Sequence, residues 1–277
     1  MNHLKTIARD ARGIAMRCGW LVAFRWLWCV ALTFRACVAS RNLQPADLRM
    51  GNGPFLVDRR GARARLTGQQ IFSGIREIWV RDVYLKNDYL KIPKGALVVD
   101  LGANLGNFTS LALAQHEDVR VVAVEPSLSL SNSLRVTTSY NGWSNRVAIK
   151  RAFVGLTTKA QAGVANSPDY MGAPFVTEQA FLDEFDIRRI DFLKCDIEGS
   201  EFYMLDPSSR MLSITTNLAI EIHVWGGSLS RFLDHLRDIG FEIGSVVTDS
   251  TGSCIALCRR LGPRASTVGH VGEPQTV

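Results

Sequence analysis

From residue 96 onward the chain alternates between short apolar runs and more polar segments. Runs rich in valine, isoleucine and leucine are typical of buried parallel strands, and the segments between them have the spacing of helices. Strands are expected over residues 96–100, 119–125, 146–153, 190–196 and 217–223, and helices over residues 107–115, 128–140, 177–185 and 229–239. The alternation predicts an α/β fold, in which helices cover both faces of a doubly wound, mostly parallel sheet.

Two further apolar runs, residues 241–247 and 253–258, flank the polar sequence Asp249-Ser-Thr-Gly. A polar, glycine-containing connection of this length predicts a C-terminal antiparallel hairpin that closes the sheet. The residues from Gly262 onward are polar and lack an apolar period, so disorder is expected there. The main domain is therefore expected to span residues 96–260, followed by a tail over residues 261–277.

Residues 19–39 are apolar and rich in tryptophan, but Arg25 and Arg35 interrupt them. A membrane span needs about 20 apolar residues, and each charge near its middle costs about 2.5–3.5 kcal/mol. The mixture is typical of a helix that lies at a membrane interface, and it fits equally well a helix packed on the main domain or in an oligomer. A signal peptide is a third reading, because the start is basic and Cys37-Val-Ala-Ser follows the apolar stretch.

We expect residues 1–41 to form this helical extension and residues 42–95 to form a separate N-terminal subdomain. Within residues 42–95, the pattern predicts short strands over 55–57 and 63–66, on either side of a turn at Arg60-Gly61, and a helix over 69–83.

The formal net charge of the 277-residue chain is +6, and seven basic residues fall within the first 41, opposed only by Asp10. A basic N-terminus is suited to anionic lipid, so peripheral membrane association is expected for a chain that is otherwise cytoplasmic. A second basic cluster, residues 59–65, has no interleaved aromatic side chains and matches no nucleic-acid-binding motif, so no nucleic-acid partner is expected. The six cysteines are too scattered for a disulfide framework, which favours a reducing compartment.

The strongest motif is VVDLGANLG, residues 98–106, in which an apolar strand runs into a glycine-rich turn before a helix. Glycines at such a turn allow a ligand to approach the backbone. The spacing is D-x-G-x-N-x-G, whereas dinucleotide-binding turns read G-x-G-x-x-G. The carboxylate of Asp100 suits the cationic amino-acid end of S-adenosylmethionine and would repel a pyrophosphate. Asp100, Gly102, Asn104 and Gly106 are therefore candidate cofactor-binding residues.

Glu125 ends the second expected strand and precedes Pro126. A carboxylate at this position is suited to accept hydrogen bonds from both hydroxyls of a ribose. An acidic residue at a helix start is the alternative reading, because the helix dipole favours it there. Together with the glycine-rich turn, Glu125 is a fifth candidate cofactor-binding residue.

Polar side chains also follow the fourth and fifth expected strands. Asp196 and Glu198 come from DFLKCDIEGSE, and Glu221 and His223 from the later EIH. Ligands of open α/β sheets bind beyond the carboxyl ends of the strands, so both pairs are expected to face the cofactor crevice. Glu201, in contrast, is interpreted as a helix N-terminal acid.

These segments resemble, in this order, the FkbM family of methyltransferases: VVDLGANLGNFT, VEPS, DFLKCDIEGSE and IEIH. The resemblance covers about residues 96–241 and implies a class I, Rossmann-like methyltransferase fold. It implies S-adenosylmethionine as cofactor and O-methylation of a hydroxyl on a sugar, a glycan or glycolipid, or a secondary metabolite. It also implies that the five candidate residues hold the cofactor, while Asp196, Glu198, Glu221 and His223 line the acceptor side.

A hydroxyl acceptor must lose a proton, and a histidine is able to take it at neutral pH. We expect His223 to act as the base, oriented by Glu221 or Asp196. A divalent cation such as Mg²⁺, held by Asp196, Glu198 and His223, is an alternative way to activate the hydroxyl. Two functions from other classes stay open: a non-catalytic module that binds the cofactor or a protein, and an NAD-dependent oxidoreductase.

Overall fold

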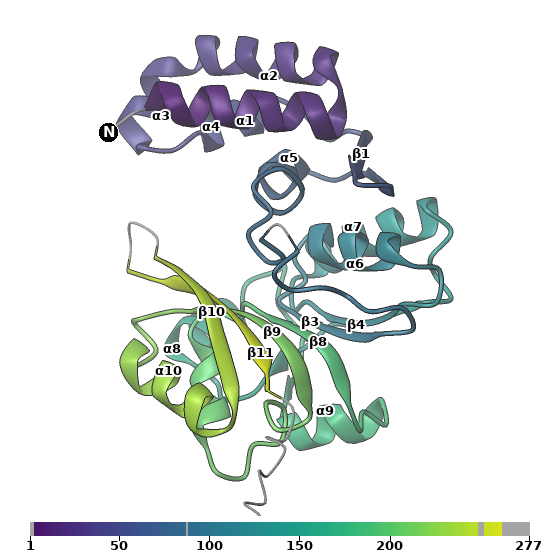
Figure 1. Ribbon diagram of the computed structural model, residues 1–277, viewed down its shortest axis with the longest axis vertical. Helices are drawn as coiled ribbons and strands as arrows, with labels where there is room; N and C mark the ends of the chain where they lie inside the picture. The colour runs from purple at the N-terminus through teal and green to yellow at the C-terminus, as the bar shows by residue number, and fades with distance from the viewer. Residues whose placement is uncertain (1–2, 87, 249–251, 262–277) are drawn as a thin grey trace, which may run out of the picture.

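Apolar side chains on both faces of consecutive strands build a seven-stranded sheet in the computed structural model (Figure 1). The structure describes residues 3–86, 88–248 and 252–261, so the predicted tail from residue 262 and the hairpin tip at 249–251 lie outside the described residues. The strands are β3 (Leu97–Leu101), β4 (Arg120–Val124), β5 (Val147–Lys150), β8 (Ile190–Cys195), β9 (Thr215–Ile222), β10 (Phe241–Thr248) and β11 (Cys254–Arg260).

The strand order is β10-β11-β9-β8-β3-β4-β5, and β11 runs antiparallel to both of its neighbours. The pairs β9–β8, β8–β3, β3–β4 and β4–β5 are parallel. This arrangement confirms the predicted doubly wound sheet with a C-terminal antiparallel hairpin. The order reverses direction at β3, so the segments that leave β3 and β8 diverge there and open a crevice at the carboxyl ends of the strands.

Helices cover both faces of the sheet, with side chains that fix where several of them begin. Ser127 and Thr177 each accept a hydrogen bond from a backbone N–H three residues later, as helix N-caps do. The helices of this part are α6 (Asn107–Gln115), α7 (Leu128–Tyr140), α8 (Lys159–Val164), α9 (Glu178–Glu184), the 3₁₀ helix η2 (Ser200–Leu205) and α10 (Leu229–Asp238).

The third expected strand is shorter than residues 146–153. β5 ends at Lys150, and the next residues leave the sheet to form β6 (Phe153–Val154), which pairs with β7 (Phe175–Val176). The Arg151 side chain lies at this departure and donates hydrogen bonds to the carbonyls of Pro126 and Met171.

The N-terminal region lies together at one end of the molecule (Figure 1). Its elements are α1 (His3–Cys18), α2 (Trp20–Leu32), α3 (Phe34–Ser40), α4 (Gln44–Leu48), β1 (Phe55–Arg59), β2 (Ala62–Leu66), α5 (Ile71–Gly74) and η1 (Ile75–Val80). The single helix expected over residues 69–83 is instead the short α5 continued by one π-helical segment, η1. It starts after Gln70, whose left-handed backbone (φ +63°) precedes α5.

Two apolar cores lie on opposite faces of the sheet, because neighbouring residues of a strand point to opposite sides. Val98 belongs to one core and Val99 to the other. Ile14 of α1 and Trp26 of α2 are fully buried in the same core as Val98. The inner faces of the N-terminal helices are therefore packed into the protein.

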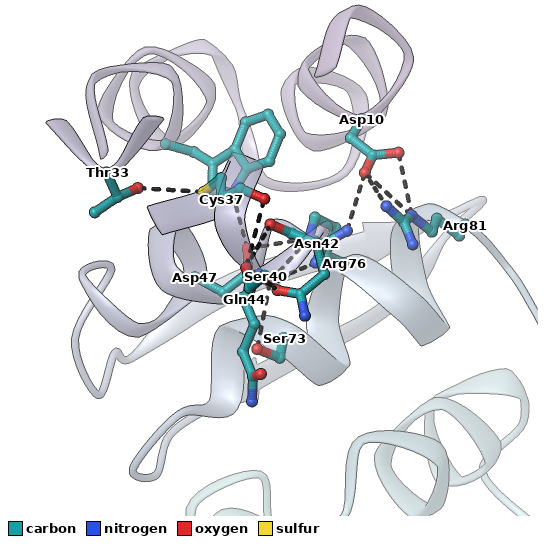
Figure 2. A network of polar contacts seen from close by, with 11 residues as sticks. Asp10, Thr33, Cys37, Ser40, Asn42, Gln44, Asp47, Ser73, Arg76 and Arg81 are labelled. Atoms are coloured by element: carbon teal, nitrogen blue, oxygen red, sulfur yellow. Dashed lines mark hydrogen bonds and ion pairs between the residues drawn. The ribbon is translucent and has the colours of Figure 1, made fainter. Parts of the chain in front are cut away.

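Arg76 of η1 lies between two buried aspartates (Figure 2). Its Nη2 donates to Asp47 Oδ2 (2.6 Å), and its Nη1 donates to Asp10 Oδ2 (3.1 Å). Asp47 Oδ1 also accepts from the indole Nε1 of Trp26 (2.9 Å). Because buried charges are stable only when they are paired, this network fastens α1, α2 and α4 to η1.

Within the described residues, no single helix is long and apolar enough to cross a membrane. The helices α2 and α3 reach that length and hydropathy only as a pair, and the chain bends by 75° between them. The six cysteines all lie in the described part of the chain and form no disulfide there, and Cys254 and Cys258 are buried in β11, as a core role predicts.

Candidate active site

Two cavities open at the carboxyl ends of the central strands, and residues of the glycine-rich loop after β3 line both. The first has a volume of about 340 Å³ and the second about 520 Å³. Gly102, Asn104, Leu130 and Asp196 line both. The motifs after β3, β4, β8 and β9 were expected to face one crevice. Glu125 and Glu198 also line the first cavity, whereas Glu221 and His223 line neither of the two.

The backbone of the glycine-rich loop is held by β4 and faces the exit of β8. Gly102 N and Ala103 N both donate to the carbonyl of Val124 (3.0 and 2.9 Å). Gly102 has φ +75°, and a Cβ at this position would lie 1.8 Å from the carbonyl oxygen of Asp196. The protein backbone itself therefore requires glycine here, and Gly102 also lines both cavities.

The last glycine of the motif serves the packing of a helix. Gly106 has φ +81°, and a Cβ there would lie 2.2 Å from Leu134 Cδ1 in α7. It precedes α6 and lines neither of the two cavities.

Asp100 lies under the loop and is fully buried. Its Oδ2 accepts from the hydroxyl of Thr109 (2.6 Å), and Lys194 Nζ lies 3.5 Å from its Oδ1. Burial raises the pKa of Asp100, while Lys194 and Thr109 act in the opposite direction, so the charge of Asp100 depends on Lys194. Asp100 lines neither cavity, so its carboxylate does not face the open space in which a cofactor would lie. The cation that it faces is Lys194.

Lys194 is a site residue that the sequence analysis missed. It stands opposite Asp100 in the β3–β8 register and donates to the carbonyl of Gly102 (2.6 Å), while lining the second cavity. Burial lowers its pKa, but Asp100 and Asp196 raise it by more, so the net shift is upward and Lys194 is charged. A lysine between the buried apolar residues Leu193 and Cys195 of a strand is the signal in the sequence that marks this residue.

Glu125 is placed as expected, at the end of β4 and on the wall of the first cavity. Its two carboxylate oxygens accept from the backbone N–H groups of Asn104 (2.8 Å) and Ser127 (2.9 Å). Each oxygen keeps a second lone pair for a ligand hydroxyl. Burial raises the pKa of Glu125 to about 7, and the two backbone hydrogen bonds limit the rise.

The candidate catalytic residues of β8 and β9 come together as expected around one imidazole nitrogen. His223 Nε2 lies 3.8 Å from Asp196, 3.7 Å from Glu198 and 3.8 Å from Glu221. Burial and the nearby Asp196 raise the pKa of Glu221 to about 7. The His223 side chain is 4% exposed, so its neighbours, rather than water, set its charge.

The orienting partner of His223 is Glu201, not Glu221 or Asp196 as expected. Glu201 Oε1 accepts from the backbone N–H of His223 (2.6 Å) and lies 3.1 Å from its Nδ1. Glu201 is fully buried and lies in the first turn of η2, as its interpretation as a helix N-terminal acid predicts, and it contacts His223 in addition. Burial lowers the pKa of His223, but the contact with Glu201 and the charges of Asp196 and Glu221 raise it by more, so the net shift is upward.

The N-terminal region supplies much of the wall of the second cavity. Glu77 of η1 and Tyr84 line it, together with polar side chains from α4 and from the segment before η1: Gln44, Gln69, Gln70 and Ser73. Desolvation by the surrounding protein atoms, and then the charge of Asp196, raise the pKa of Glu77. The sequence analysis assigned no site residue to this region.

The comparisons with known proteins decide the family. A family model described as the methyltransferase FkbM domain matches residues 100–243, just over half of the chain. The chain belongs to the FkbM methyltransferase family. Membership of this family implies that the protein is an S-adenosylmethionine-dependent methyltransferase. Its sheet has the strand order of the class I methyltransferases.

Solved structures similar to this FkbM methyltransferase include other methyltransferases at low sequence identity. A putative rRNA methylase from Clostridium thermocellum is 10% identical, with 62% of this chain and 89% of that chain covered and a TM-score of 0.43. Precorrin-6y C5,15-methyltransferase from Geobacter metallireducens is 15% identical, with 65% and 86% covered and a TM-score of 0.43. No curated protein sequence matches the chain significantly.

Proposed function

We propose that this FkbM methyltransferase methylates a hydroxyl group of a neutral polar acceptor, such as a sugar, a glycan or glycolipid, or a secondary metabolite, with His223 as general base. The observation that carries the proposal is the pair formed by His223 and the buried Glu201 at the exit of β9. Hydroxyl groups need a base before they become good nucleophiles, and a histidine held by a buried carboxylate is a base of that kind.

The chemistry of the pair follows from which nitrogen faces which group. Glu201 accepts at Nδ1, which keeps a proton on that nitrogen and leaves Nε2 as the proton acceptor. Nε2 faces the carboxylates of Asp196, Glu198 and Glu221. When Nε2 takes the hydroxyl proton, these carboxylates stabilise the resulting imidazolium, and Glu201 keeps the ring in place.

The first cavity fits the nucleoside part of S-adenosylmethionine. Glu125 offers two acceptor lone pairs where a ribose would lie, and the apolar side chains of Leu130, Phe153 and Val154 offer flat walls for an adenine ring. Asn104 belongs to the loop that lines this cavity, and Asp100 and Gly106 support the conformation of that loop. When bound, the cofactor supplies the electrophilic methyl group. The acidic surroundings of His223 favour its positive sulfonium.

The second cavity supports a hydroxyl-rich acceptor. Its wall offers three glutamine amides and several hydroxyls, which donate and accept hydrogen bonds without a net charge. Glu77 and Asp196 would repel an anionic acceptor such as a phosphate ester. The cavity meets the first one at Asp196, so an acceptor there reaches the strand exits where His223 lies.

A second way to activate the hydroxyl has one observation in its favour. Ligand atoms of Asp196, Glu198 and His223 lie within 4.8 Å of one another, a spacing that would allow a divalent cation such as Mg²⁺ to join them. In that case His223 would be a ligand instead of a base. Chelator treatment followed by Mg²⁺ titration separates the two: with His223 as base, turnover persists in the presence of chelator.

The proposal is tested by turnover on a panel of sugars and polyol glycans, measured as S-adenosylhomocysteine release, with the methylated atom identified by NMR. His223→Ala should lower the rate by about 10²–10⁴-fold and leave cofactor affinity unchanged, since a general base contributes that much. Glu201→Gln should lower the rate while cofactor affinity is retained, and Glu201→Asp should recover part of it. A product methylated on nitrogen or carbon, or a near-normal rate for His223→Ala, would refute the assignment.

A further inference from the structure

The outer face of α2 and α3 is apolar and exposed. Trp20, Phe24 and Trp28 follow one another at intervals of four residues, so they share one side of α2. Their exposed fractions are 68%, 63% and 66%. Further apolar side chains of α2 and α3 have about half or more of their area exposed: Leu21, Leu32, Phe34 and Val38. We call these seven residues the aromatic face.

The opposite side of α2 is fixed to the protein. Trp26 on that side is fully buried and bonded to Asp47. Between the two sides, the exposed Arg25 donates from Nη2 to the carbonyl of Met50 (2.7 Å). A helix with two apolar sides therefore keeps one side in the core and presents the other to the outside. Exposed apolar patches of this kind mark interaction surfaces.

The exposed charges in the segment that carries the aromatic face are of one sign. The first 41 residues contain seven basic side chains and a single acid, Asp10, which is buried and paired with Arg76 and Arg81. Basic side chains exposed on α1, α3 and the turn after α3 are Lys5, Arg9, Arg12, Arg35 and Arg41. The region thus combines tryptophans with an uncompensated positive charge.

We infer that the aromatic face docks on an anionic lipid bilayer, with α2 lying in the plane of the interface. Tryptophan rings are favoured at the boundary between headgroups and acyl chains, and arginines nearby reach the phosphates. Basic residues near an anionic leaflet each add about 1 kcal/mol of attraction, a factor of about five in affinity. Full insertion of α2 would instead pull Trp26 out of the core, so the packing favours a helix lying flat.

Charge selects the membrane over a second copy of this chain. In a symmetric dimer the same patch meets itself, so the basic groups around the aromatic face of one protomer would oppose those of its partner. An anionic bilayer offers opposite charge together with an apolar interior. The proposal is independent of the methylation chemistry, because none of the seven residues lines either cavity of the active site.

The test is cosedimentation of the full chain with vesicles of phosphatidylcholine, alone or mixed with phosphatidylglycerol. Binding is expected to the anionic vesicles and to weaken with salt. The triple variant Trp20→Gln, Phe24→Gln, Trp28→Gln should lose at least about tenfold in partition coefficient. A matched variant carries Leu56→Gln, Val136→Gln and Val247→Gln, at positions that are 64%, 56% and 52% exposed elsewhere, and should bind as the unaltered chain does.

Light scattering on the same proteins gives the opposing outcome. If the unaltered chain is a dimer, binds neither kind of vesicle, and becomes a monomer in the triple variant, the aromatic face is a self-association surface and the proposal is overturned. Equal loss of vesicle binding in both variants would overturn it as well, because the aromatic face would then have no special part. Circular dichroism melts of both variants show that the packed inner side of α2 is retained.

Discussion

Cofactor binding should depend on pH through Glu125, because its pKa is raised to about 7 by burial. Only the ionised carboxylate accepts from both ribose hydroxyls without giving up an acceptor site to its own proton. With a pKa near 7, about one tenth of the carboxyl groups are ionised at pH 6 and about nine tenths at pH 8. The affinity should therefore fall about tenfold as the pH is lowered from 8 to 6.

The assay is isothermal titration of S-adenosylhomocysteine into the protein across this pH range, which requires no knowledge of the acceptor. The ligand has its own α-amino group, with an ordinary pKa of about 7.7–8.0, so its titration must be separated from that of Glu125. Glu125→Gln supplies the comparison, because the amine titrates equally in both proteins. The ratio of the two affinities should change about tenfold between pH 8 and pH 6.

The variant has a predictable defect of its own. One of the two backbone donors that Glu125 satisfies, Asn104 N or Ser127 N, would face the amide NH₂ of a glutamine. A buried donor without its acceptor costs about 1–3 kcal/mol, so the variant should melt at a lower temperature but stay folded. An affinity ratio that is constant with pH would refute the role of Glu125 as an ionised ribose acceptor.

Two stability predictions use matched controls. Arg76→Met should lower the free energy of unfolding by about 3 kcal/mol, the lower end of the range for breaking a buried ion pair, because Asp47 keeps its bonds from Trp26 and Ser73; Arg63→Met, which removes an exposed pair, should cost under about 1 kcal/mol, and equal urea midpoints would contradict the network. Gly102→Ala should lower the melting temperature clearly more than Gly142→Ala does. Both glycines have φ near +75°, but only at Gly102 would the new Cβ lie close to a backbone oxygen. Similar melting temperatures would show that the loop is able to move aside.

Much of the fold was predictable because buried parallel strands appear as continuous apolar runs. The strands β3, β4, β8 and β9 lie within two residues of their expected bounds. The errors arise where contacts distant in sequence decide the backbone. Arg151 bonds carbonyls of two other segments where β5 ends, and η1 has an apolar spacing that does not distinguish a π-helix from an α-helix.

The site was predictable in its position and less so in its pairings. Sheet topology brings the carboxyl ends of β3, β4, β8 and β9 to one edge of the sheet, where Glu125, Asp196 and His223 were expected. Which carboxylate contacts which nitrogen depends on side-chain directions after the strands have ended. Glu201 and His223 are 22 residues apart, and no spacing in the sequence records their contact. Lys194 meets Asp100 only through the register of β3 and β8.

The wall of the second cavity is built from two separate stretches of the chain, and this has a consequence for how such enzymes diversify. The three glutamines that line it come from residues before 71, whereas the matched family segment begins at residue 100. If acceptors bind there, selectivity and methyl-transfer chemistry reside in different stretches of the gene. Exchange of the first 95 residues between relatives would then redirect the enzyme to a new acceptor while the residues that hold the cofactor stay unchanged. Arg76 and its partners Asp10 and Asp47 all lie within those 95 residues, so the exchange would move the buried ion pairs as one unit.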